Sequence, residues 1–165
     1  MGTGTPFLLL LMTVHVNIGS NIGPGHLIVR RAASMIAEEF ATEVRQAPVE
    51  VSEPWGFQSP NLFVNLGIAF ESESEPPVIL RRLRAIERAI DPSPHRKPDG
   101  SYADRRIDID LIAMGPEVVA TDELTLPHPR MHLRQFVLRP VALLEPNWVH
   151  PLTGLTAAEM LGQLV

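Results

Sequence analysis

Residues 61–71 alternate so regularly between apolar and other side chains that they dictate how a sheet must be built around them. In an extended strand, successive side chains point to opposite faces. One face therefore carries a continuous apolar row formed by Leu62, Val64, Leu66, Ile68 and Phe70. The opposite face carries Phe63, Asn65, Gly67 and Ala69. We predict that helices cover the apolar face and that the opposite face stays open to a ligand.

Other periodic segments surround this strand. They predict, in order, a strand over residues 14–18, a helix with Val29, Ala33, Ile36 and Phe40 on its core face, a strand over residues 44–52 that Pro48 breaks, the strand over residues 61–71, a helix that opens at Pro76-Pro77, and a strand over residues 107–112. This order predicts an α+β fold with a ferredoxin-like βαββαβ core sheet and helices on one face. We expect a C-terminal elaboration from residue 124 that ends in a short helix near residues 156–164. A short strand near residues 118–119 is expected to pair with the strand over residues 107–112.

Composition limits the classes of protein and of chemistry. A chain of 165 residues with 45% hydrophobic residues predicts one domain, over residues 13–165, with a substantial core. A net charge of −5 argues against bulk electrostatic binding to nucleic acid or to an anionic membrane. The absence of cysteine excludes disulfides, thiolate metal sites and cysteine catalysis, and it fits a cytoplasmic protein. Nothing calls for a partner chain, so we expect a monomer that acts on small molecules.

Residues 1–12 form an N-terminal extension of doubtful relevance. The apolar run over residues 7–12 is shorter than a membrane span, which needs about 20 residues. Because Met12 directly precedes a good strand, our main interpretation is a misplaced start codon. A weak signal or anchor is the alternative.

Two carboxylates, Asp108 and Asp110, lie in the strand predicted over residues 107–112. Alternation sends Asp108 and Asp110 to one strand face, roughly 6.5–7 Å apart along the backbone. Side chains at that spacing converge on a hard cation such as Mg²⁺, which prefers carboxylate, phosphate and water oxygens. The same alternation places His15 and Asn17 on this face. The alternative is a solvated charged row, with Phe63 packed under a loop.

Three further groups of charged residues accompany the pair. Arg84 and Glu87 are three residues apart on one side of a predicted helix, where a surface ion pair is the default interpretation. The loop over residues 91–105 carries Arg96 and Arg105, and a loop of this length is usually either a lid or disordered. The alternative for its charges is a solvated loop. Arginines on a lid close over phosphates and supply charge in a transition state. Residues 126–134 hold two histidines and two arginines, but zinc-ligand spacing is missing. Phosphate binding by His128 and Arg134 fits better beside an acidic, metal-bearing strand.

Six short motifs occur together in this chain. They are Asn17-Ile-Gly-Ser-Asn21, Glu53-Pro-Trp-Gly-Phe-Gln58, Phe63-Val-Asn65, Ile86-Glu87-Arg88, Asp104-Arg-Arg-Ile-Asp-Ile-Asp110 and Pro127-His-Pro-Arg-Met131. In this order they resemble the 6-hydroxymethyl-7,8-dihydropterin pyrophosphokinases of folate biosynthesis. The resemblance covers about residues 13–151, and the ordered set is far more specific than any one motif.

The resemblance implies an activity and a set of site residues. Enzymes of that family move the β,γ-pyrophosphoryl group of ATP to the hydroxymethyl oxygen of the pterin and release AMP. By resemblance, Asp108 and Asp110 hold two Mg²⁺ ions, and Arg105 and Arg96 act in catalysis from the lid. The pterin pocket would consist of Gly19, Trp55, Phe63, Asn65 and Phe136. The ATP contacts would be Arg84, Glu87, Leu111, Thr125, His128 and Arg134.

The chain departs from the family pattern at three places. Trp55 stands where a smaller apolar residue is common, and Glu123 stands where some members carry an arginine. Tyr102-Ala103-Asp104 replaces an aromatic-Gly-Pro sequence before Arg105. We therefore expect altered lid behaviour with activity retained.

Three other classes of protein share parts of this pattern. An RNA-recognition module has the same βαββαβ order, but it needs aromatic and basic residues on its open face. A ferredoxin-like regulatory domain that binds a small ligand would not explain arginines beside paired aspartates. A palm-type Mg²⁺-dependent nucleotidyltransferase also carries Asp-x-Asp on an open sheet. It would release pyrophosphate rather than AMP.

Overall fold

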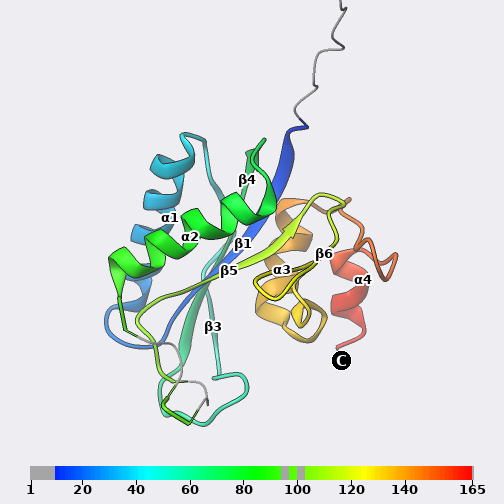
Figure 1. Ribbon diagram of the computed structural model, residues 1–165. Coiled ribbons are helices and arrows are strands. Elements are labelled where there is room, and N and C mark those ends of the chain that lie inside the picture. The colour runs from blue at the N-terminus through cyan, green and yellow to red at the C-terminus, as the bar shows by residue number, and fades with distance from the viewer. Residues whose placement is uncertain (1–9, 94–96, 100–102, 165) are drawn as a thin grey trace, which may run out of the picture.

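An antiparallel sheet of five strands lies between two layers of helices (Figure 1). This computed structural model describes residues 10–93, 97–99 and 103–164. The elements in chain order are β1 (Met12–Ser20), α1 (Gly25–Phe40), β2 (Arg45–Gln46), β3 (Glu50–Ser52), β4 (Phe63–Ser72), α2 (Pro76–Ile90), β5 (Asp108–Met114), β6 (Val119–Ala120), β7 (Thr125–Leu126), the 3-10 helix η1 (Met131–Leu133), α3 (Gln135–Leu144) and α4 (Ala157–Gly162).

The sheet places β1 at its centre, between β4 and β5. The outer edge of β4 is paired with β2 and, further along, with β3, so these two short strands share one edge position. Pro48 lies between β2 and β3, where its missing N–H and fixed φ interrupt the strand. The predicted element order and the broken edge strand are confirmed, and the α+β class is that of the ferredoxin-like fold.

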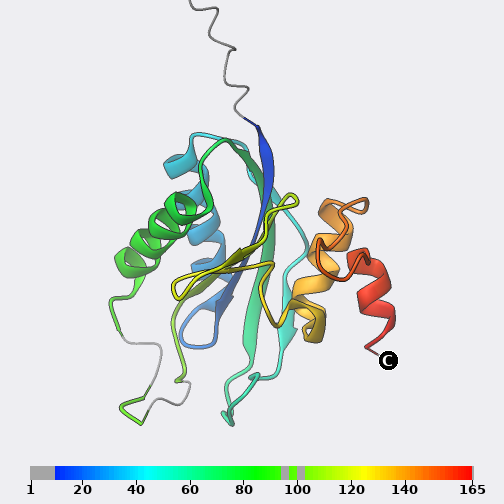
Figure 2. The ribbon, with the colours of Figure 1, turned by 45° about the vertical axis from the view of Figure 1, so that its right-hand side comes forward.

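Helices α1 and α2 cover one face of the sheet (Figure 2). The main core lies between them and the strands, where Leu66, Ile68 and Phe70 of β4 are almost fully buried. This confirms the predicted apolar face, with one exception. Leu62 precedes the first residue of β4 and is 54% exposed, so it does not belong to the buried row.

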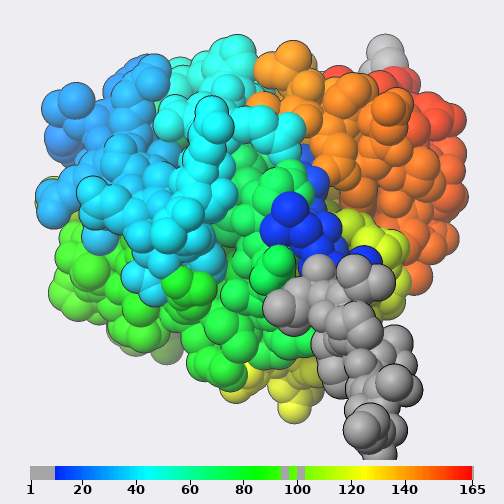
Figure 3. All heavy atoms as spheres, turned by 90° about the horizontal axis from the view of Figure 1, so that it is seen from above, coloured from blue at the N-terminus to red at the C-terminus, as the bar shows by residue number. Residues whose placement is uncertain are grey.

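The opposite face is only partly open, which corrects the prediction that it is uncovered. Helix α3 packs on β4 and on α4, and the two helices form the end of the molecule away from α1 and α2 (Figure 3). A second core, with Ile112 and Trp148, lies beneath them. His15 is on this face as predicted, but it is 1% exposed, with Glu145 3.6 Å from its Nε2. The sequence pattern missed α3 because Pro140 interrupts its helical signal.

The short strand predicted near residues 118–119 does form, as β6, but its predicted partner was wrong. β6 pairs with β7 in a separate hairpin, with Ala120 opposite Thr125. The turn is closed locally, since the Thr121 N–H donates to the Leu124 carbonyl and the Leu124 N–H donates to the Thr121 hydroxyl. The expected C-terminal helix near residues 156–164 is confirmed as α4, which Thr156 caps. No helix among the described residues is long and apolar enough to span a membrane.

Helix α3 approaches the sheet so closely that one position of β4 requires glycine. A Cβ atom placed on Gly67 would lie 2.1 Å from Cβ of Pro140. We therefore expect Gly67→Ala to lower the free energy of unfolding by about 2 kcal/mol, as overpacking does in a filled core. Urea denaturation measures this change. Gly162→Ala is the matched control, because a Cβ there has no neighbour within 4 Å. Equal stability of the two variants would contradict the close packing.

Candidate active site

The register of the sheet brings the predicted site residues into two adjacent rows. Gly19 of β1 is paired with Asn65 of β4 on one side and with Asp108 of β5 on the other. Two residues earlier, Asn17 is paired with Gly67 and with Asp110. Alternation turns these side chains to the face that α3 covers only in part. Residues that are far apart in the sequence therefore meet on three neighbouring strands.

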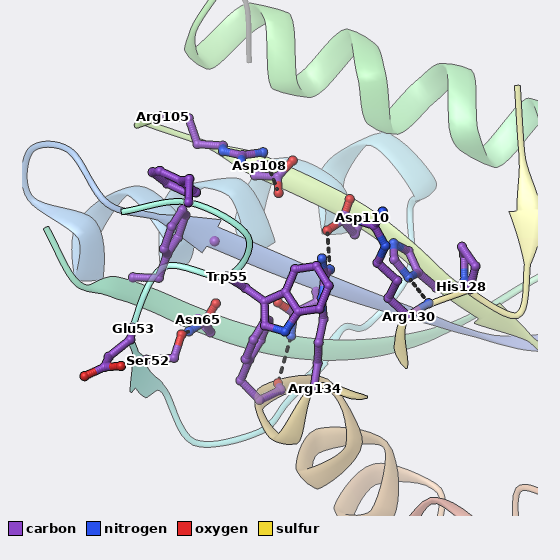
Figure 4. Close-up of a pocket in the computed structure, with 16 residues that line it drawn as sticks. Ser52, Glu53, Trp55, Asn65, Arg105, Asp108, Asp110, His128, Arg130 and Arg134 are labelled. Carbon is purple, nitrogen blue, oxygen red and sulfur yellow. Dashed lines mark hydrogen bonds and ion pairs between the residues drawn. The ribbon is translucent and has the colours of Figure 1, made fainter. Parts of the chain in front are cut away.

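A pocket of about 300 Å³ opens over these rows (Figure 4). Polar and charged residues on its wall are Asn17, Ser52, Glu53, Asn65, Arg105, Asp108, Asp110, His128, Arg130 and Arg134. Gly19, Trp55, Phe57, Phe63, Pro129 and Phe136 complete the wall. The pocket thus has an aromatic part and a strongly charged part.

Each of the two carboxylates has an arginine beside it. Arg105 lies 3.2 Å from Asp108, and Arg134 lies 4.0 Å from Asp110. Burial raises the pKa of the Asp110 carboxyl, and the charges of Arg134 and Arg84 oppose that rise. A carboxylate that is costly to keep charged favours a nearby cation. This end of the pocket is therefore suited to a cationic ligand or to a metal that accompanies an anion.

The donor set fits a hard divalent cation held by few protein ligands. Among the residues that the structure describes, His, Asp and Glu side chains form no cluster of three or more that could enclose a metal. The two adjacent carboxylates, Asp108 and Asp110, fit Mg²⁺, which commonly takes one or two protein carboxylates and completes its shell with phosphate and water. Zinc, which usually takes three or four protein ligands, fits this site poorly.

A β-bulge in β5 positions His128. Leu111 is paired with Val16 and Ala113 with His15, so Ile112 is an extra residue in the ladder. The freed carbonyl of Ile112 accepts a hydrogen bond of 2.7 Å from the backbone N–H of His128. This contact draws the segment after β7 against the end of the Asp-x-Asp strand.

His128 is uncharged at neutral pH. Its pKa falls to about 4, chiefly because it is buried and also because Arg134 and Arg130 are close, although Asp108 opposes the shift. Its Nδ1 accepts a hydrogen bond of 3.1 Å from the backbone N–H of Arg130. The neutral ring therefore carries its proton on Nε2, which makes it a hydrogen-bond donor without a charge.

Asp104 and Asn21 hold the end of the long loop where it enters β5. The Asn21 side chain donates to Asp104 Oδ1 at 2.8 Å, and its Oδ1 accepts from the Arg105 N–H at 2.7 Å. Asn61 donates to the other oxygen of Asp104 at 3.1 Å. Asp104, one of the departures from the family pattern, thus links three segments and orients Asn21, whose Oδ1 holds the backbone N–H of Arg105.

Arg84 and Glu87 contact the free edge of β5. Glu87 accepts a hydrogen bond of 2.7 Å from the Ile109 N–H, and Arg84 donates one of 2.9 Å to the Ile109 carbonyl. The two side chains also lie 3.2 Å apart. Glu87 is buried, so this is more than the surface ion pair that is the default interpretation. The pair holds the backbone between Asp108 and Asp110 and does not line the pocket.

The aromatic part of the pocket lies beside Asn65. Phe63 meets the edge of Phe57 at a centroid distance of 6.2 Å, and it is 9% exposed. The Asn65 amide donates to the Ser52 hydroxyl at 2.7 Å, which fixes the amide plane. Its Oδ1 faces Gly19, where a Cβ atom would lie 3.5 Å away. An apolar wall with a fixed amide suits a flat heterocycle with polar edges.

The predicted site residues fall into three groups. Those that line the pocket are Gly19, Trp55, Phe63, Asn65, Arg105, Asp108, Asp110, His128, Arg134 and Phe136. Those that lie outside it are Arg84, Glu87, Leu111 and Thr125. Leu111 packs into the main core, and Thr125 is exposed on β7. Arg96 lies outside the described residues.

Sequence reasoning did not assign Asn17, Ser52, Glu53, Phe57, Pro129 and Arg130, which also line the pocket. Asn17 had a signal, because alternation places it on the same face as Asp108 and Asp110. Arg130 had a weaker one, as a second arginine in the segment after β7. The other residues belong to irregular segments or a strand end, where no period in the sequence reveals which side chains turn inward.

A family model and relatives of this chain in three bacteria are named after the same pyrophosphokinase activity. The model of the family described as 7,8-dihydro-6-hydroxymethylpterin-pyrophosphokinase matches residues 15–146. A 2-amino-4-hydroxy-6-hydroxymethyldihydropteridine pyrophosphokinase of Porphyromonas gingivalis is 37% identical over 140 residues, which are 84% of this chain and 93% of that protein. Proteins of the same name from Aquifex aeolicus and Bacillus subtilis are 30% and 27% identical, over 86% and 78% of this chain and 86% and 75% of their own lengths.

The contacts of Asp104 predict a measurable change in local opening. Asp104→Ala removes both side-chain hydrogen bonds, so we expect the Arg105 amide to exchange with solvent about 10-fold faster. Hydrogen exchange followed by NMR measures this rate. Asp122→Ala, on an exposed turn, is the control and should leave that amide unchanged. The same rate in both variants would show that Asp104 does not hold the loop.

Proposed function

Because this chain belongs to the 7,8-dihydro-6-hydroxymethylpterin-pyrophosphokinase family, we propose that it transfers the β,γ-pyrophosphoryl group of ATP to 6-hydroxymethyl-7,8-dihydropterin. The hydroxymethyl oxygen bonds to the β-phosphorus and its proton passes to solvent. The bond between that phosphorus and the α,β-bridging oxygen breaks, and AMP leaves with the oxygen. The step belongs to folate biosynthesis. The observation that carries this proposal is one pocket that joins paired carboxylates and arginines to an aromatic wall with a fixed amide.

The charged part of the pocket is suited to the polyphosphate. Asp108 and Asp110 would hold two Mg²⁺ ions, which neutralise charge on the bound triphosphate and on the transferring group. Arg134 and neutral His128 donate hydrogen bonds to phosphate oxygens, and Arg105 faces the transferring group. Such a reaction depends on positioning and charge more than on a covalent intermediate, so no nucleophilic side chain is required.

The aromatic part of the pocket is suited to the pterin. Phe63 and Phe136 present apolar surface to the ring, and Trp55 closes the wall on the loop side. The Asn65 carbonyl accepts hydrogen bonds from the pterin's N–H groups, because the Asn65 amide nitrogen is already held by Ser52. Gly19 leaves the space that the ring needs beside Asn65.

Two kinds of role remain for the predicted ATP contacts outside the pocket. Arg84 and Glu87 orient the Asp-x-Asp backbone, and the exposed part of Arg84 is available to the nucleotide. Leu111, Thr125 and Arg96 are proposed as ATP contacts from the family resemblance alone. For the protein as a whole, we propose a monomeric cytoplasmic enzyme whose single domain spans residues 13–165.

The proposed reaction predicts a diagnostic product. With Mg²⁺, ATP and 6-hydroxymethyl-7,8-dihydropterin, the protein should release one AMP for each pterin converted, and the pterin should gain a diphosphate. Separation of nucleotides by ion-exchange chromatography, with mass spectrometry of the pterin, measures both products. Omission of the pterin or chelation of Mg²⁺ should stop AMP release. Release of pyrophosphate with AMP attached to the pterin would identify a nucleotidyltransferase instead.

A further inference from the structure

The indole of Trp55 lies within reach of two guanidinium groups. Its ring centroid is 4.6 Å from Cζ of Arg134 and 5.1 Å from Cζ of Arg130. Both distances fall within the range of cation–π attraction. All three residues line the pocket, and they lie together beside Asp110 in Figure 4. Trp55 therefore faces the phosphate side of the site as well as the pterin side to which the sequence assigned it.

The shared ring brings two like charges close together. Arg130 and Arg134 repel one another, so their joint placement favours an anion that can bind both. A neighbouring group responds to the same charges: after burial, Arg134 and Arg130 are among the causes that lower the pKa of His128. Two guanidinium groups thus lie close together next to the predicted metal site.

The segment after β7 that positions His128 at the pocket also positions Arg130 there. The backbone N–H of Arg130 donates to Nδ1 of His128 at 3.1 Å, and the His128 N–H donates to the carbonyl of Ile112 at 2.7 Å. Arg130 is therefore linked to the strand that carries the Asp pair through one hydrogen bond to the His128 side chain and one backbone hydrogen bond from His128 to Ile112. Arg130 is an exposed residue that lines the pocket, so a bound polyanion can reach it.

The balance of charges on the pocket wall also depends on Arg130. Among the residues that the structure describes, three arginines and three carboxylates line the pocket, and ATP with two divalent cations adds no net charge. Without Arg130, two arginines would face three carboxylates among these described residues.

We propose that Arg130 is a further polyphosphate-binding residue of this enzyme, and that Trp55 is a positioning residue that holds Arg130 and Arg134 as a pair. The proposal rests on the proposed function, because ATP supplies the polyanion. Arg130 binds a phosphate oxygen through a charge-assisted hydrogen bond, and the indole limits the directions in which the two guanidinium groups can point.

The test is the affinity for an ATP analogue in the absence of pterin. We would titrate the full chain with Mg²⁺ and α,β-methylene-ATP and measure the dissociation constant by calorimetry. In this analogue a methylene group replaces the α,β-bridging oxygen, so the bond that breaks during transfer cannot be cleaved. Arg130→Met should weaken binding about 10-fold, the usual effect of losing one charge-assisted contact. Arg81→Met removes an equal charge from an exposed position on α2 and should leave the affinity unchanged.

Variants of Trp55 separate positioning from general loop damage. Trp55→Leu should weaken analogue binding several-fold, whereas Trp55→Phe keeps an aromatic face and should retain most of the affinity. The double variant of Trp55→Leu with Arg130→Met should lose less affinity than the sum of the two single losses, because both changes disturb the Arg130 contact, whereas only Trp55→Leu also releases Arg134. Additive losses would contradict the positioning role of Trp55.

Steady-state kinetics gives a second measurement. Arg130→Met should raise the KM for ATP about 10-fold and change kcat less than 3-fold, since the contact is present before and during transfer. If Arg130→Met binds the analogue as tightly as Arg81→Met, the inference is wrong, and Arg130 is a solvated rim residue. Failure of the unmodified protein to bind the analogue or release AMP would instead contradict the proposed function itself.

Discussion

The backbone pairing of β1 with β4 and β5 is the constraint on which the whole site depends. It places Asn65, Gly19 and Asp108 in one row and Gly67, Asn17 and Asp110 in the next. A slip of one residue in either pairing would turn the side chains of the displaced strand to the opposite face. The apolar residues between them prevent the slip, since Ile18, Leu66 and Ile109 are fully buried against α1 and α2.

The partial cover of the second face is what makes a pocket out of this surface. Helix α3 lies on Gly67 and closes the sheet on that side, and the Phe136 carbonyl accepts a hydrogen bond from Asn17. The loops before β4 and after β7 close other sides. The pocket is therefore built from a rigid strand register and from irregular segments that backbone and amide hydrogen bonds tie to it. Arg105 is held in the same way, by Asn21.

The parts of this structure that obey a short period could be predicted, and the others could not. Alternation gave the strands and placed Asp108 and Asp110 on the ligand face, because one face had to be buried. Helix α3 was missed, because Pro140 interrupts its helical pattern in the sequence. Gly67 did not reveal it either, since a glycine in a strand does not indicate that a helix packs against it. The contact of Trp55 with two arginines depends on loops whose course no period describes. The roles of individual residues came from the ordered motifs, which carry information that periodicity lacks.

The central claim is that the strand register presents Asp110 as a metal-binding carboxylate for ATP. Its most direct test is the Mg²⁺ dependence of AMP release by Asp110→Asn, which keeps the shape of the side chain and removes its charge. Asp122→Asn on an exposed turn is the matched control. The account predicts a loss of turnover of at least about 100-fold for Asp110→Asn, with the fold intact by circular dichroism. Turnover equal to that of Asp122→Asn, with an unchanged requirement for Mg²⁺, would contradict it.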